Sequence, residues 1–168
     1  ELPPVVAAAT HYESAGFRLV KLQADSKKPV SEKGWQNAAP EASDFLAGGN
    51  IGVQLGAKSG HLVDIDLDCE EARRLAGLPC LFGHLPAFRR KSLPADAPGH
   101  RLVLCADAPD EVMQFAFTKR LELEAIADLG LPKAVILELR AGRGYTVFPP
   151  SVIEGDPLVW NRSGPDTP

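Results

Sequence analysis

The sequence predicts one mixed α/β or α+β domain, and two observations support that prediction. The chain has 168 residues, of which 45% are hydrophobic and 24% are charged, a composition typical of one globular domain that is large enough to bury a core. Segments with strand-like alternation follow segments with helical spacing in an irregular order, which favours mixed layers of sheet and helix. Glycine and proline number 15 each, so many loops are expected.

The expected elements can be placed in chain order. They are a helix over 5–15 that ends at Gly16, a strand over 17–22, a short helix over 41–45, strands over 51–55 and 61–67, a short helix over 70–76, a strand over 101–105, a mostly helical segment over 110–130, and strands over 134–139 and 144–148. The last two strands flank Ala141-Gly142-Arg143, which indicates a hairpin-like turn. The polar segment from Gly155 is expected to be a linker or frayed tail, so the domain is expected over 1–154.

Composition excludes several classes of protein. No apolar run approaches the roughly 20 residues that cross a bilayer. The three cysteines do not form a disulfide framework, which indicates a reducing cytoplasm. A net charge of −4 means that a nucleic-acid partner has to meet a local basic patch. The chain begins with Glu1 rather than Met, so we expect a domain excised from a longer protein.

Two acids interrupt an apolar strand at Val63-Asp64-Ile65-Asp66. Side chains two positions apart share one face of a strand, so Asp64 and Asp66 are expected to lie together. Partly buried carboxylates repel each other and lose hydration, so a cation is expected between them, and Mg²⁺ takes such oxygen ligands. A solvated acidic face is the alternative. Asp68 is either an accessory group or the N-cap of the next helix.

Glu138 is a lone acid in the apolar strand over 134–139, where it needs a partner. If this strand neighbours the strand of Asp64, three carboxylates converge. Such a triad can hold two metal ions that activate a 3′ oxygen and stabilise a leaving pyrophosphate. The alternative is an ion pair of Glu138 with Arg140 or Arg143.

Basic side chains occupy loops at strand ends, where phosphates can dock. Solvated lysines are the alternative in these loops, and His100 is either a phosphate donor or a structural residue. The segment over 56–60 lacks the spacing of an ATPase phosphate loop. The side chains expected to form a local basic groove are Lys27, Lys28, Arg89, Arg90, Lys91, Arg140 and Arg143.

Cys69, Cys80 and His84 fall within 16 residues but contain no CxxC spacing and lack a fourth ligand. The sequence therefore favours ordinary thiols over a structural Zn²⁺ ion.

Short motifs occur in a specific order along nearly the whole chain. They are YESAGF at 12–17, SKKP at 26–29, GWQ at 34–36, NIGV at 50–53 with Gly56 and SG at 59–60, VDID at 63–66, GHR at 99–101, ELR at 138–140, and GY at 144–145 leading to PPS at 149–151. In these motifs the chain resembles the N-terminal domain of the bifunctional DNA primase/polymerase family. This family is the prim-pol branch of the archaeo-eukaryotic primases, found in plasmids, phages and prophages.

The resemblance implies a primase-type α/β fold in which a catalytic sheet packs against helices and the N-terminal strands form a second small sheet or lobe. It implies that Asp64 and Asp66 are the metal-binding pair, that Glu138 is the third catalytic carboxylate, and that two Mg²⁺ or Mn²⁺ ions bind them. His100 matches the histidine that contacts the nucleotide phosphates. The other matching positions of the nucleotide site are Lys28, Arg140, Arg143 and Ser151.

The implied activity is template-dependent DNA priming and polymerisation, with transfer of nucleotides from NTP or dNTP to a 3′ hydroxyl. The implied partners are a DNA template and primer, and a helicase or other replication domain beyond Pro168. Two alternatives stay open: a non-catalytic module that binds nucleic acid or nucleotide, and a metal-dependent nuclease or phosphoesterase.

Overall fold

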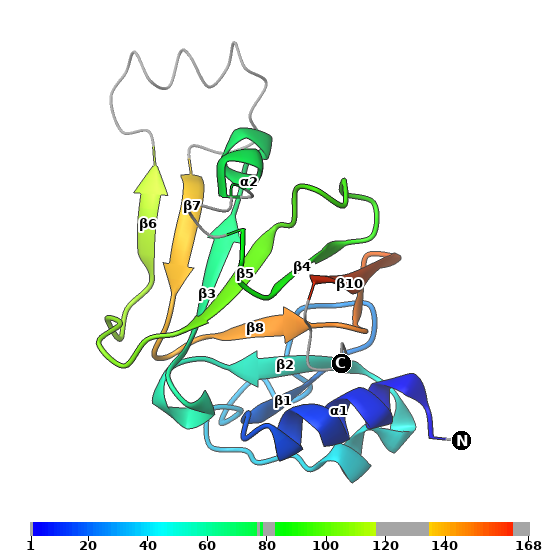
Figure 1. Cartoon of the computed structure of the whole chain (residues 1–168). Helices are drawn as coiled ribbons and strands as arrows, with labels where there is room; N and C mark the ends of the chain where they lie inside the picture. Colours follow the sequence, from blue (N-terminus) through cyan, green and yellow to red (C-terminus); the bar gives the residue numbers. More distant parts are fainter. Residues whose placement is uncertain (1, 77, 79–82, 117–134, 163–168) are drawn as a thin grey trace.

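The computed structural model describes residues 2–76, 78, 83–116 and 135–162, and these residues form two antiparallel sheets. The small sheet has the order β1-β2-β8, from β1 (Leu19–Leu22), β2 (Asn50–Gln54) and β8 (Tyr145–Phe148). The helix α1 (Pro4–Ser14) runs alongside it, and β8 lies on the side next to the large sheet (Figure 1). The predicted second sheet built from N-terminal strands is therefore confirmed, with β8 added at its edge.

The large sheet has seven strands in the order β6-β7-β3-β5-β4-β10-β9. Their bounds are β3 (Leu62–Leu67), β4 (Ala87–Arg90), β5 (His100–Leu104), β6 (Met113–Ala116), β7 (Val135–Arg140), β9 (Val152–Ile153) and β10 (Asp156–Arg162). The remaining elements are the helix α2 (Glu70–Ala76) and the 3₁₀ helices η1 (Ala42–Ala47) and η2 (Ala57–Ser59). Mixed antiparallel sheets with few helices make this an α+β domain, as the sequence predicts.

Two apolar clusters cover the two faces of the large sheet. Ile65 and Leu67 point to one face, where they pack with Ala72 and Ala76 of α2. The opposite face joins the small sheet through a larger core of aromatic and aliphatic side chains. The alternation along β3 therefore directs its acids toward the junction of the two sheets.

A cluster of aromatic rings stabilises that junction. Phe148 of β8 contacts Tyr12, Phe88 and Trp160 at centroid distances of 5.2–5.5 Å. The buried Tyr12 hydroxyl donates to the Pro149 carbonyl at 2.6 Å and accepts from Trp160 Nε1 at 3.0 Å. These bonds tie α1 to both sheets. No described helix is long and apolar enough to span a membrane.

Three local expectations differ from the structure. The segment over 110–130 is not helical in its described part, because residues 113–116 form β6, which pairs with β7. The rest of that segment lies outside the described residues. The strands β7 and β8 do not form a hairpin, because β7 pairs with β3 and β6 while β8 pairs with β2.

The turn after β7 instead carries the chain from the large sheet to the small one. Gly142 in this turn has φ of 59°, and a Cβ on Gly56 would lie 2.7 Å from the Gly142 Cα. Glycine at both positions permits this close approach.

The third difference lies in the expected tail. Residues 156–162 form β10, which pairs with β4 and places Leu158 and Trp160 against the core. The strands β4 and β9 are not expected from the sequence either.

Candidate active site

One cross-strand row of side chains crosses the centre of the large sheet. Antiparallel pairing puts Phe88 of β4 opposite His100 of β5, His100 opposite Asp66 of β3, Asp66 opposite Glu138 of β7, and Glu138 opposite Gln114 of β6. Directly opposed residues have their side chains on the same face. The sequence hypothesis that the strand of Glu138 neighbours the strand of Asp64 is therefore confirmed.

Asp64 lies two positions before Asp66 on β3, next to this row, and is fully buried. Nδ1 of His100 lies 3.2 Å from Asp64 Oδ1 and 3.1 Å from Oδ2, so the imidazole donates to this carboxylate. Burial alone would raise the pKa of Asp64, but the charge and hydrogen bond of His100, followed by a hydrogen bond with Thr146, hold that pKa below its ordinary value. Asp64 is therefore a carboxylate that orients His100.

The partners of His100 favour its protonated form. Burial acts to lower the pKa of His100, but the charge and hydrogen bond of Asp64 and the charge of Asp66 raise it above its ordinary value. The ring stacks on Phe88 with a centroid distance of 4.5 Å and an interplanar angle of 9°. Because Nδ1 is engaged by Asp64, Nε2 is the nitrogen left to donate to an anion.

Arg140 links the two remaining acids of the predicted triad. Its Nη2 lies 2.6 Å from Asp66 Oδ2 and 2.6 Å from Glu138 Oε2. Gln114 Nε2 donates to the other Glu138 oxygen, Oε1, at 2.5 Å. Burial and the charges of Asp64 and Asp68 raise the pKa of Asp66, whereas the charges of His100 and Arg140 act to lower it. The net result is a pKa above the ordinary value. The alternative pairing of Glu138 with Arg140 is thus present together with the convergence of the acids.

The carboxylates also offer a set of ligands for a metal ion. Asp66, Asp68 and Glu138 each have an oxygen within 4.8 Å of the others. Hard divalent ions prefer such oxygen donors, so these residues fit Mg²⁺ or Mn²⁺. This set differs from the predicted triad, because Asp68, just after the end of β3, joins it. Asp64 is buried more deeply, where His100 and Thr146 hold its oxygens.

A cavity of about 150 Å³ opens beside the row, between the large sheet and β8. The charged side chains that line it are Lys27, Arg90, His100 and Arg140. Arg90 also forms an ion pair with the exposed Glu154 at 3.4 Å. A cavity whose charged groups are all basic is suited to a phosphate chain.

The other predicted nucleotide-site residues lie elsewhere. Lys28 and Arg143 are exposed, and the cavity is lined by Lys27 in place of its neighbour Lys28. Ser151 is buried, and its hydroxyl accepts from the Ile51 amide at 2.8 Å, so it joins the β8–β9 turn to β2. Thr146 and Gln114 are site residues that the sequence reasoning missed, although Thr146 is marked by being polar within an apolar strand.

Of the three residues considered as zinc ligands, the structure describes Cys69 and His84. Cys69 is buried, and its Sγ accepts from the Ala72 amide at 3.4 Å. His84 is exposed, and Cys80 lies outside the described residues.

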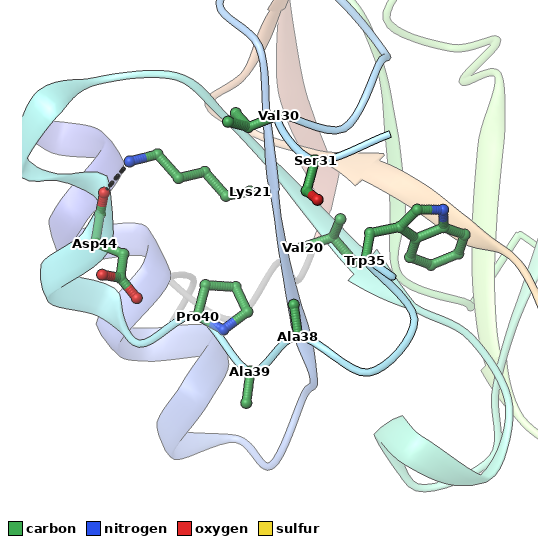
Figure 2. A pocket seen from close by; sticks show the side chains of 9 residues that line it. All are labelled: Val20, Lys21, Val30, Ser31, Trp35, Ala38, Ala39, Pro40 and Asp44. Carbon is green, nitrogen blue, oxygen red and sulfur yellow. Dashed lines mark hydrogen bonds between the residues drawn. The ribbon is translucent and has the colours of Figure 1, made fainter. Parts of the chain in front are cut away.

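A second cavity, of about 360 Å³, lies in the lobe of the small sheet. Figure 2 shows Trp35 and Val30 on one side of it and Pro40 and Ala39 on the other, with the Lys21 ammonium bonded to the backbone oxygen of Asp44. Trp35 meets Tyr145 edge-on at 4.7 Å, and Tyr145 lines the basic cavity. A residue that lines the second cavity therefore contacts a residue that lines the basic cavity.

Comparison with known proteins decides the family. The family model described as "bifunctional DNA primase/polymerase, N-terminal" matches residues 8–168. The chain belongs to this family. A search of curated proteins gives no match. Membership supports a DNA primase/polymerase domain of the nucleotidyltransferase class, whose substrates are DNA and nucleotides and whose members generally use divalent metals. The resemblance seen in the sequence motifs is confirmed.

Proposed function

We propose that this primase/polymerase domain transfers a nucleotide from NTP or dNTP to a 3′ hydroxyl paired with a DNA template, using divalent ions held by its carboxylates. The observation that carries the proposal is the direct contact between an acidic row and a basic cavity. His100 and Arg140 belong to both, because they contact the acids and line the cavity. A nucleotide with bound metal needs both features side by side.

The carboxylates divide into an inner and an outer part. Asp66 and Glu138 form the centre of the proposed metal site, Asp68 adds an oxygen from beyond the end of β3, and the buried Asp64 supplies negative charge nearby. Bound ions would lower the pKa of the 3′ hydroxyl and stabilise charge on the leaving pyrophosphate. No protein nucleophile is needed, since the attacking oxygen belongs to the primer.

The basic residues hold and orient the triphosphate. Asp64 fixes His100 through Nδ1, so the protonated ring donates from Nε2 toward a phosphate oxygen. Phe88 restricts the tilt of that ring by stacking on it. Lys27 and Arg90 provide further positive charge on the walls of the cavity, so the phosphate chain is aligned before the reaction.

The family resemblance extends the proposal to the whole protein. We place the domain in the replication of a plasmid, phage or prophage, joined to a helicase or another replication domain in the full-length chain. Arg143 and Lys28 are exposed, and in the sequence they lie close to the cavity-lining residues Arg140 and Lys27. We assign both side chains to contacts with the DNA backbone.

A labelled primer-template assay with Mn²⁺ or Mg²⁺ tests the activity. The purified domain should lengthen the primer, and Asp66→Asn or Glu138→Gln should lower the extension rate by about 100-fold or more, because each removes a charged ligand of the proposed site. Glu13→Gln, at an exposed position on α1, is the matched control and should extend normally. Shortening of the primer would indicate a nuclease, and unchanged extension by both site variants would refute the site.

A further inference from the structure

Arg140 belongs to two sites at once. Its Nη2 contacts Asp66 Oδ2 and Glu138 Oε2 at 2.6 Å each, and its Nε donates to the same Glu138 oxygen at 2.8 Å. The same side chain lines the basic cavity together with Lys27 and Arg90. The guanidinium is therefore placed on the boundary between the acidic row and the proposed phosphate pocket.

A guanidinium and a divalent ion compete for these two carboxylates. Asp66 and Glu138 are two of the three carboxylates that can converge on one ion, and each already has an oxygen 2.6 Å from Arg140. An ion at this place would also repel the positive charge of Arg140 at short range. The Arg140 side chain is 30% exposed, which leaves it room to turn toward the cavity.

We propose that the Arg140 side chain moves between two positions, one on the acids of the central row and one on the triphosphate in the basic cavity. Without an ion it neutralises Asp66 and Glu138, and when an ion binds these acids the guanidinium moves to the triphosphate in the cavity. The inference rests on the proposed function, because it takes the two acids as ion ligands. Its consequence is positive coupling: the ion makes Arg140 available to the triphosphate, and the triphosphate removes the competitor of the ion.

The first test measures Mn²⁺ binding without nucleotide, by the electron paramagnetic resonance signal of the free ion. Arg140→Gln removes the competing guanidinium, so we expect Mn²⁺ to bind about tenfold more tightly than to the wild-type domain. Lys27→Gln is the matched control, because it removes one positive charge from the same cavity, and its Mn²⁺ affinity should stay within about threefold of the wild-type value. Equal or weaker Mn²⁺ binding by Arg140→Gln would overturn the proposal.

The second test uses inorganic tripolyphosphate in the presence of EDTA, with calorimetry as the readout. The double variant Asp66→Asn with Glu138→Gln mimics neutralisation by an ion, so it should bind tripolyphosphate about tenfold more tightly than the wild-type domain. That gain should persist when Lys27→Gln is added and disappear when Arg140→Gln is added. A gain that persists equally with Arg140→Gln would show that it arises from general electrostatics, and the proposal would be wrong.

These measurements are separable from the proposed activity. Failure of the wild-type domain to extend a primer would refute the proposed function, whereas the tripolyphosphate cycle uses neither metal nor primer. If Arg140→Gln does not fold, Arg140→Lys replaces it, because lysine keeps the charge and loses the planar fork that holds both acids. We expect the same tightening of Mn²⁺ binding, and its absence would again overturn the exchange.

Discussion

Replacing Asp64 by asparagine isolates the charge on which the proposed role of His100 depends. Both oxygens of the buried carboxylate lie within 3.2 Å of His100 Nδ1. The amide in Asp64→Asn would keep one oxygen as an acceptor for that nitrogen but would remove the negative charge that raises the pKa of His100. Burial of the ring, which acts to lower this pKa, would then be opposed less strongly, so we expect the pKa of His100 to fall in this variant.

The sign of the pH dependence follows from the raised pKa of His100. The imidazolium is present below that pKa and is lost as the pH rises through it. The affinity of the wild-type domain for triphosphate should therefore decline as the pH rises through the pKa of His100. In Asp64→Asn the same decline should begin at lower pH. A hydrogen bond from a charged donor contributes about 1.5–3 kcal/mol, so losing the cation should weaken triphosphate binding by roughly 30-fold.

Nuclear magnetic resonance titration of the histidine side chains in EDTA measures this pKa directly. The chain contains four histidines, so His11, His61 and His84 are internal references in the same sample. Binding of tripolyphosphate, followed by calorimetry across the same pH range, gives the affinity. Glu13→Gln is the control for loss of a distant acid. A pKa of His100 in Asp64→Asn that equals or exceeds the wild-type value would refute the reasoning.

Two further predictions concern the metal site and the core. Asp68→Asn should weaken Mn²⁺ binding by about tenfold, because it removes one charged oxygen ligand, and unchanged affinity by paramagnetic resonance would remove Asp68 from the ligand set. Tyr12→Phe should lower the free energy of unfolding in urea by about 1–3 kcal/mol, because it leaves the buried Pro149 carbonyl and the partly buried Trp160 Nε1 without this partner. Tyr145→Phe, which loses an exposed hydrogen bond to a backbone carbonyl, should cost less, and an equal loss in both variants would contradict this explanation.

The acidic centre was accessible from the sequence because its signals are local. The period-two spacing of Asp64 and Asp66 fixes their common face, and an acid as isolated as Glu138 within an apolar strand requires a partner. The register between their strands is not local, yet it is limited by the need to compensate these charges. The structure pairs Asp66 with Glu138, and Arg140 compensates the charge of these opposed acids by contacting both.

The strands β6 and β10 were not accessible in the same way. Residues 113–116 contain one polar side chain, Gln114, between Met113 and Phe115, and they form a strand because β7 offers an edge with which to pair. In β10 the signal is Leu158 and Trp160 at period two inside a polar, proline-rich segment. Their burial depends on β4, whose own strand character was hidden by two arginines.

The choice between Lys27 and Lys28 shows why loop residues are harder to assign than strand residues. The two are adjacent, so composition and spacing treat them alike. The loop closes through the pairing of Leu22 with Pro29 and through the Tyr145 hydroxyl, which donates to the Lys27 carbonyl at 2.7 Å. These distant contacts put Lys27 on the wall of the cavity, and no local pattern encodes them.

The charges of the central row explain why one place can serve both an arginine and a metal ion. Among the described residues of the site, His100 contacts Asp64, and Arg140 contacts Asp66 and Glu138. A divalent ion bound by Asp66, Asp68 and Glu138 would add two positive charges beside Arg140, so the ion and the guanidinium would repel each other. The ion would also compete with Arg140 for the carboxylates of Asp66 and Glu138. A guanidinium that loses these acceptors is left partly buried without them, so the phosphate oxygens of an incoming nucleotide become its most favourable partners.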